Sequence, residues 1–432
     1  MTNKPNLSEY YKKREVSVIR SVYDKFKNRK DNVVPIDLAL GNINRPMHPV
    51  LINMMKKITG PSSPFNDGVV KYSSASGYNE TQKAFLRILE ASDLPTDDLY
   101  IQITDGASQA IELCLLGISG NGEENTGPVL LFDPAYTSFE YMAKRLSRRT
   151  ISIPRVMRAD GTFEFPSIRN IERFILKEKP NAMIIIPYDN PTGQLITQGQ
   201  LESLAKLCVK YNMWMVSDET YRELHYLKLK APSIWRLSDK VIPGIQGRRI
   251  SLESASKVWN ACGLRIGSLI TDSEVFYNKS VAENTANVCP NVFGQYIFSG
   301  LAREDINDIK NWFDKQRKYY RSIINSTFTN IKKLIPDINV SKPNAALYLV
   351  LDFRKISPHF RAVDFVNFCA EYGKSKYKGQ TYTILMTPLE NFFKNKELGR
   401  AMARLSFVDD QDKIRLLPYV LKDILEQYIK NK

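Results

Sequence analysis

The feature that most constrains the fold of this 432-residue chain is a regular alternation of short apolar runs with helix-length segments. Strands that alternate with helices in this way form a mainly parallel sheet covered by helices. We expect the strands at Tyr100–Thr104, Val129–Phe132, Ala182–Ile186, Trp214–Ser217, Arg249–Leu252 and Ile266–Thr271. The helices expected between them include Ala107–Ile118, Tyr136–Leu146 and Gln198–Tyr211.

The C-terminal part of the chain has a different pattern. A long helical stretch, Glu304–Ile335, with a break expected near Thr327–Thr329, precedes a smaller set of elements that we interpret as an α+β unit. The expected elements of this unit are the strands Leu347–Phe353 and Ala403–Phe407 and the helices Ala362–Tyr372 and Lys413–Ile429.

The N-terminal segment predicts one amphipathic helix over Ser8–Arg29, whose apolar side would pack on the smaller unit. The residues that share this side are Tyr11, Val18, Ile19, Val22 and Phe26. The predicted fold class is therefore α/β, with two domains. The large domain covers residues 36–310, and the small domain combines residues 1–35 with residues 311–432.

The charge balance gives little support to a nucleic-acid partner. Lysine and arginine total 61 and aspartate and glutamate total 46, so the net charge is +15. A positive surplus favours anionic partners in general. Here the basic residues are spread along the chain, and no zinc-finger or RNP-type motif accompanies them. We expect no nucleic-acid partner.

The cysteines and histidines argue against disulfide and metal sites. The five cysteines never form a CxxC pair, and the three histidines never stand at metal-ligand spacing. Reduced thiols are typical of the cytosol. The N-terminus is polar, unlike a signal peptide, and no apolar run approaches the roughly 18 residues of a membrane helix. We expect a cytoplasmic protein with no membrane partner and no metal.

Polar residues and tight turns follow strand after strand. Ligands of open α/β sheets bind at the carboxyl ends of the strands, so these segments are the candidate site. They are Asp105-Gly106-Ala107-Ser108, Asp133-Pro134-Ala135-Tyr136, Tyr188-Asp189-Asn190-Pro191-Thr192-Gly193, Asp218-Glu219-Thr220-Tyr221 and Ser254-Ala255-Ser256-Lys257.

Lys257 is the first candidate catalytic residue among them. A lysine at a strand end is usually a solvated surface residue, but this one follows serines and precedes Arg265 by eight positions in a glycine-rich segment. A free lysine amine has a pKa near 10.4 and becomes a useful nucleophile only as an imine, or when burial and neighbouring cations lower that pKa. The pattern favours a Schiff-base lysine.

Two further segments have the chemistry of a phosphate and an aromatic ring site. Ser108 stands at the start of a predicted helix, where free amides and the positive helix end would hold a phosphate, although a plain helix cap explains the serine equally well. Asp218, at a strand end, could pair with a ring nitrogen, and Tyr221 could donate to a ring oxygen. A capping aspartate is the ordinary alternative.

Taken in order, these segments resemble the class I and II aminotransferases of fold type I, which use pyridoxal phosphate. The resemblance extends from about residue 36 to residue 407 and includes a Leu-Gly-Asn near the start, Asn-Pro-Thr-Gly, Ser-x-Ser-Lys and Gly-Leu-Arg-Ile-Gly. It implies a large domain with a mainly parallel, seven-stranded type of sheet, a smaller α+β domain, and a homodimer with shared active sites.

The resemblance also implies cofactor-binding roles. Lys257 would form the Schiff base with pyridoxal 5′-phosphate and then move the proton at the substrate carbon, and Asp218 would pair with the pyridine nitrogen. Asn190 and Tyr221 would bind the ring oxygen, and Tyr136 would stack on the ring. The residues implied for the phosphate are Ala107, Ser108, Ser254, Arg265 and, from the neighbouring subunit, Tyr72.

For the substrate, the resemblance implies that Arg404 binds the α-carboxylate with help from Asn190 and the backbone of Gly41. Relatives that prefer aspartate use a second arginine from the neighbouring subunit, but no arginine occurs here between residues 266 and 302. We hypothesise that Arg45 or Lys71 takes that place for an acidic partner such as 2-oxoglutarate. A surface arginine after a turn is an equally good explanation of Arg45.

The sequence thus predicts a pyridoxal-phosphate aminotransferase that moves an amino group from an L-amino acid to a 2-oxo acid, such as 2-oxoglutarate or pyruvate. Another enzyme on the same fold, a carbon–sulfur β-lyase, a decarboxylase or a lyase similar to aminocyclopropane-carboxylate synthase, would use the same lysine and aspartate. A non-catalytic regulator is the third alternative. Too few residues precede the first motif for a DNA-binding domain with its linker.

Overall fold

A seven-stranded sheet forms the centre of the larger part of the molecule. The computed structural model describes residues 5–14, 16–123 and 126–431. The strands lie in the order β2 (Tyr100–Thr104), β10 (Gly267–Thr271), β9 (Arg249–Ser254), β8 (Trp214–Asp218), β7 (Ala182–Ile185), β3 (Val129–Asp133) and β4 (Thr150–Pro154). Only β10 is antiparallel to its neighbours in this sheet. The predicted fold class is confirmed, and β4 is a strand that the sequence analysis missed.

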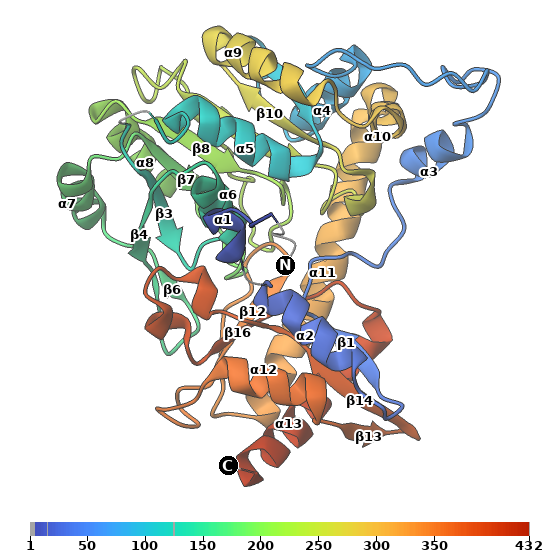
Figure 1. Ribbon diagram of the computed structural model, residues 1–432, viewed down its shortest axis with the longest axis vertical. Helices are drawn as coiled ribbons and strands as arrows, with labels where there is room; N and C mark the ends of the chain where they lie inside the picture. Colours follow the sequence, from blue (N-terminus) through green and yellow to red (C-terminus); the bar gives the residue numbers. More distant parts are fainter. Residues whose placement is uncertain (1–4, 15, 124–125, 432) are drawn as a thin grey trace.

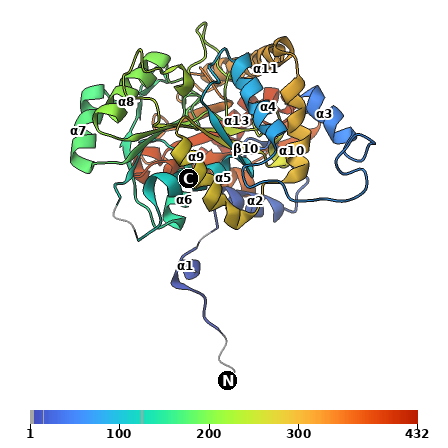
Figure 2. The ribbon, with the colours of Figure 1, turned by 90° about the horizontal axis from the view of Figure 1, so that it is seen from above.

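Helices cover both faces of this sheet, so the larger part has three layers (Figures 1 and 2). Successive strand residues point to opposite faces: Val129 and Leu131 join one apolar cluster, whereas Leu130 and Phe132 join the other. The first cluster lies under α5 (Gly106–Ser119), α6 (Thr137–Arg145) and α9 (Glu274–Asn284). The second lies under α3 (Pro49–Lys56), α4 (Asn79–Ala91), α7 (Ile168–Glu178), α8 (Gln198–Lys210) and α10 (Val292–Phe298).

A single long helix, α11 (Ile306–Leu334), runs from the larger part into the smaller one (Figure 1). Trp312 packs in the core of the larger part, and Ile324 packs in the core of the smaller part. The break predicted near Thr327–Thr329 was wrong. The segment contains no glycine or proline, and Thr327 is buried on the apolar side of the helix, so packing outweighs the low helix propensity of the threonines.

The smaller part contains two further sheets that share one core. Its helices are α12 (Ala362–Glu371) and α13 (Gln411–Lys430). One sheet has the order β11 (Asn339–Val340), β12 (Tyr348–Asp352), β16 (Met402–Ser406) and β15 (Thr387–Pro388). The other has the order β1 (Val34–Asp37), β14 (Gln380–Leu385) and β13 (Ser375–Tyr377). A separate hairpin joins β5 (Val156–Met157) to β6 (Phe163–Glu164).

Strand β1 pairs in parallel with β14, which follows it by more than three hundred residues. The predicted boundary between residues 35 and 36 falls inside this strand. The division into two domains stays a prediction. Among the helices in the described ranges, none is both long enough and apolar enough to cross a bilayer.

The N-terminal helix predicted over Ser8–Arg29 is wrong in its extent. Two helices occur there, α1 (Glu9–Lys12) and α2 (Val18–Lys27), and Glu15 lies outside the described residues. Ser17 begins the second helix because its hydroxyl accepts a hydrogen bond from the Arg20 amide. Only α2 reaches the core of the smaller part, where it buries Val22 beside α12, whereas Tyr11 of α1 is 66% exposed (Figure 2).

Candidate active site

A cavity of about 580 Å³ lies at the carboxyl ends of the large sheet, where β16 of the smaller part faces it. Most of the residues that the sequence analysis assigned to the site line this cavity. They are Gly41, Ala107, Ser108, Tyr136, Asn190, Asp218, Tyr221, Ser254, Lys257, Arg265 and Arg404. Residues from segments far apart in the chain therefore meet in one place.

The start of α5 forms one end of the cavity. The helix begins at Gly106, and the side chain of Asp105 makes no capping hydrogen bond to it; its carboxylate accepts instead from the amide of Asn291 at 2.8 Å. The strand β10 runs directly beneath this turn. A Cβ on Gly267 would lie 2.6 Å from the carbonyl carbon of Gly106 and 2.7 Å from the Ala107 nitrogen, so only glycine permits this approach. The free helix start is left facing the cavity.

Arg265 and the serines after β9 add donors at the same end. Arg265 has a positive φ of 53° and donates to the Cys262 carbonyl at 3.1 Å, and its guanidinium forms no salt bridge with any described carboxylate. The Ser254 hydroxyl donates to that of Ser256 at 2.8 Å. A helix start, two hydroxyls and a guanidinium without a counter-ion together make a cradle suited to a phosphate.

Lys257 extends into the middle of the cavity, where its ammonium donates to the Gly41 carbonyl. A Cβ on Gly41 would lie 2.7 Å from the Lys257 nitrogen, so this glycine makes room for the amine. Burial lowers the pKa of Lys257 to about 8, and the positive charges of Arg404 and Arg265 act in the same direction. The amine is thus easier to deprotonate than an ordinary lysine.

This lowered pKa gives a testable pH dependence. Removal from water disfavours the charged ammonium, so the neutral amine forms above a pH of about 8 instead of near the ordinary value of 10.5. We expect acetic anhydride to modify Lys257 of the cofactor-free protein with a half-maximal rate near pH 8, as measured by peptide mass spectrometry. Half-maximal modification near pH 10.5 would contradict the assignment.

Asp218 ends β8 with its carboxyl group buried in the cavity wall. Burial raises the pKa of Asp218 to about 6, while the Thr220 amide, 3.1 Å from one carboxylate oxygen, acts in the opposite direction. Asp218 is therefore a carboxylate at neutral pH. Its negative charge is available for a positively charged ring nitrogen.

Tyr348 of β12 is a site residue that the sequence analysis left without a role. Its hydroxyl makes a short hydrogen bond with the hydroxyl of Tyr221, and both side chains are buried. The guanidinium carbon of Arg404 lies 4.8 Å from the centre of the Tyr348 ring and 5.4 Å from that of Phe392. Tyr348 lies in the strand predicted over Leu347–Phe353, but the sequence pattern did not predict the pairing of β12 with β16 that brings Tyr348 beside Arg404.

Arg404 is a buried cation without an acidic partner among the described residues. Its side chain is 4% exposed, and it donates to the Asn190 side-chain oxygen at 3.0 Å and to the Ala39 carbonyl at 2.8 Å. Its Nε has no hydrogen-bond partner in the described part of the chain. A buried charge is costly unless an opposite charge meets it. The arrangement is that of a binding group for a carboxylate.

Three of the residues that the sequence analysis proposed for the site lie away from the cavity. Tyr72 is 79% exposed on the segment between α3 and α4, which extends away from the body of the molecule (Figure 1). Arg45 donates to the Gln316 side-chain oxygen at 2.8 Å, and its guanidinium carbon lies 3.6 Å from the centre of the Tyr319 ring. Lys71 is also exposed. Within the described chain, neither Arg45 nor Lys71 lines the cavity.

Comparison with known proteins identifies the family. The profile described as aminotransferase class I and II matches residues 36–392. The chain belongs to this family. The protein is therefore an enzyme that transfers amino groups, and the aminotransferase has the fold that its sequence predicted.

Characterised relatives differ in their named substrates. The aminotransferase is 25% identical to an aspartate aminotransferase of Sulfolobus acidocaldarius over 370 residues, which cover 84% of each chain. It is also 25% identical to a 2-aminoadipate transaminase of Thermus thermophilus, over 66% of this chain and 67% of the relative.

Solved structures of related enzymes have the same fold. A mutant aspartate aminotransferase of Thermus thermophilus superposes with a TM-score of 0.79 at 18% identity, covering 98% of this chain and 100% of that one. A kynurenine aminotransferase of Pyrococcus horikoshii gives a TM-score of 0.77 at 20% identity, covering 98% and 97%.

Proposed function

We propose that the aminotransferase uses pyridoxal 5′-phosphate to move an amino group from an L-amino acid to a 2-oxo acid, such as 2-oxoglutarate or pyruvate. One observation supports this above all others. A single cavity holds the amine of Lys257 and the carboxylate of Asp218 between a phosphate-type cradle and the guanidinium of Arg404, which has no acidic partner among the described residues. An amine, an acid and two anion sites are what this cofactor and an amino acid together require.

The residues of the cavity fit the cofactor. The donors at the start of α5 and after β9 suit its phosphate, the carboxylate of Asp218 suits its ring nitrogen, and Lys257 suits its aldehyde. When bound, the cofactor withdraws electrons from the α-carbon of the amino acid and so makes its proton removable. We assign the phosphate to Ala107, Ser108, Ser254 and Arg265, the ring nitrogen to Asp218, the ring oxygen to Asn190 and Tyr221, and the ring face to Tyr136.

The chain's own residues orient the substrate and move the proton. Arg404 offers two parallel N–H groups to the α-carboxylate, and Asn190, which already accepts from Arg404, fixes the guanidinium plane. Because Arg404 holds the carboxylate, the α-carbon is fixed with respect to Lys257. Less orientational entropy is then lost when the proton is transferred. The amine of Lys257, with its pKa near 8, accepts the α-proton and later returns it.

Further parts of the proposal concern the assembly and the acidic substrate. The exposed Tyr72 supports a homodimer in which this tyrosine reaches the cofactor phosphate of the neighbouring subunit. A contact of Arg45 or Lys71 with an acidic 2-oxo acid stays a prediction. The cysteines in the described ranges are free thiols, which supports a cytoplasmic location.

An absorption spectrum with single amino acids and no 2-oxo acid tests the proposal. We expect a visible band that changes to that of the pyridoxamine form when a donor is added and returns with 2-oxoglutarate or pyruvate. Formation of pyruvate and ammonia, or of carbon dioxide, without the pyridoxamine form would favour a lyase or a decarboxylase. Absence of any bound cofactor would contradict the proposal.

A further inference from the structure

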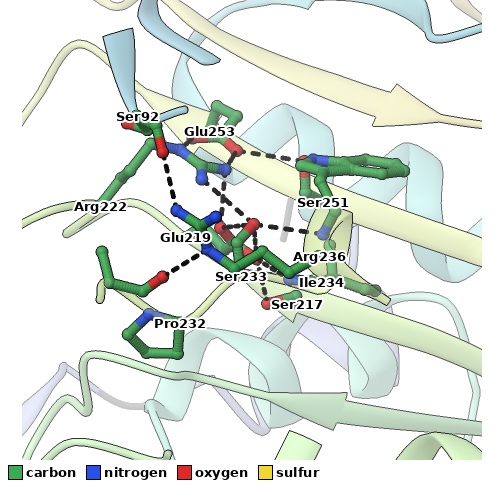
Figure 3. A network of polar contacts seen from close by, with 12 residues as sticks. Ser92, Ser217, Glu219, Arg222, Pro232, Ser233, Ile234, Arg236, Ser251 and Glu253 are labelled. Carbon is green, nitrogen blue, oxygen red and sulfur yellow. Dashed lines mark hydrogen bonds and ion pairs between the residues drawn. The ribbon is translucent and has the colours of Figure 1, made fainter. Parts of the chain in front are cut away.

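A buried cluster of charges lies at the neighbouring ends of β8 and β9 (Figure 3). It consists of Glu219, Arg222 and Glu253, and the side chains of all three are nearly inaccessible to solvent. The Arg222 guanidinium lies 2.6 Å from a Glu219 carboxylate oxygen and also forms an ion pair with Glu253. Two carboxyl groups and one guanidinium are therefore held together out of contact with water.

Each member of this cluster is the chain neighbour of a residue that lines the cavity. Glu219 directly follows Asp218, Arg222 directly follows Tyr221, and Glu253 directly precedes the last residue of β9. Successive side chains of a strand point to opposite faces. Glu253 and Ser254 of β9 therefore point to opposite faces of the sheet, while Glu219 and Arg222 lie in the turn that follows β8, beside the site residues Asp218 and Tyr221.

The cluster is tightly bound to the sheet. The backbone amide of Glu219 donates to the Leu252 carbonyl at 3.0 Å, which joins the end of β8 to β9. The carboxylate of Glu219 also accepts from the Ile234 amide at 2.7 Å and from the hydroxyls of Ser217 and Ser233 (Figure 3). Few conformations satisfy all of these partners at once. The cluster thus limits how far the neighbouring site residues can turn.

Stability alone is a poor reason for such a cluster. Taking several charges out of water is costly, and well-packed apolar residues often stabilise a core as well or better. The hydrogen bonds that surround Glu219 and Arg222 reduce this cost, and what the arrangement gains is a defined geometry. The site residues that need this geometry are those adjacent in the chain.

We propose that Glu219, Arg222 and Glu253 are positioning residues for the cofactor: their buried ion pairs hold Asp218, Tyr221 and Ser254 in the directions that bind it. This inference rests on the proposed function, since it concerns pyridoxal phosphate. None of the three lines the cavity, so each acts through its chain neighbour.

Titration of cofactor-free variants with pyridoxal phosphate tests the inference. Glu219→Gln keeps the size of the side chain and removes its charge, and Arg222→Lys keeps a charge but loses the planar fork. For both variants we expect the Kd to rise about 10–100-fold, the scale seen when partners that orient metal ligands are removed. The visible band of the bound cofactor should also change its pH dependence, because Asp218 is displaced.

A matched control lies at the other end of the same strand. Arg249 and Asp272 form a largely buried pair at 2.8 Å where β9 begins, and neither residue lines the cavity. We expect Asp272→Asn to lower the Tm and to leave the Kd unchanged, because the pair does not adjoin a residue that binds the cofactor.

The outcomes separate this inference from the proposed function. If Glu219→Gln or Arg222→Lys lowers only the Tm, as the control does, the inference is overturned and the proposed function stands. If one of the two variants does not fold, the other decides by the same criterion. If the unsubstituted protein takes up no pyridoxal phosphate, the proposed function fails and the inference fails with it.

Discussion

Lys257→Ala is expected to stop amino transfer, with a loss in kcat of at least about 10²–10⁴-fold, the usual contribution of a positioned proton-transfer group. No other amine lines the described part of the cavity, so nothing can replace Lys257 as base. The phosphate cradle and Asp218 are unchanged in this variant. We therefore expect cofactor binding to be weakened and not abolished, whereas conversion of the donor is lost.

The control is a lysine outside the cavity. Lys144 of α6 lies on the protein surface and pairs with Glu140 at 2.7 Å. Lys144→Ala should retain the activity of the unsubstituted enzyme. The activity of both variants is measured as the consumption of the amino donor under single-turnover conditions. Activity of Lys257→Ala close to that of the unsubstituted enzyme would show that the base lies elsewhere.

The second large effect is expected for Arg404. Removing one partner of a buried, hydrogen-bonded charge pair typically costs about 2–5 kcal/mol, so Arg404→Ala should lower kcat/KM by a factor of about 30 to 5,000. The loss should be mainly in KM. Arg404→Lys should recover only part of it, because an ammonium cannot hold a carboxylate with two parallel hydrogen bonds.

Steady-state kinetics with two kinds of donor distinguish this role from a structural one. An amine that lacks the α-carboxylate makes no ion pair with Arg404, so its kcat/KM should fall far less in both variants than that of an α-amino acid. An equal loss for donors with and without the carboxylate would mean that Arg404 supports the cavity and does not bind the substrate.

The sequence predicted the elements whose character depends on local pattern. Apolar runs bounded by turns predicted six of the seven strands of the large sheet to within two residues at each end, and β2 matches its prediction at both ends. The errors arose where a local signal competed with tertiary contacts. Packing against two cores keeps α11 continuous, and the Ser17 cap divides the predicted N-terminal helix. Strand β1 was missed because its pairing with β14 is non-local.

The residues of the candidate site were likewise predictable only where a local sequence pattern specifies their position. Residues in motifs that directly follow predicted strands, such as Asp218 and Lys257, could be placed in one site because the carboxyl ends of parallel strands share an edge. Tyr348 and Phe392 enter the cavity from the smaller part, and no pattern within one segment specifies how the two parts meet. Arg45 was placed near the substrate by analogy, whereas its side chain binds Gln316 of α11.

The most direct test of the central claim is to reduce the enzyme with borohydride in the presence of pyridoxal phosphate and to map the modified peptide by mass spectrometry. Reduction makes an imine between a lysine and the cofactor permanent. We expect one phosphopyridoxyl group, attached to Lys257, and none in Lys257→Ala. Attachment to another lysine, or no attachment at all, would contradict it.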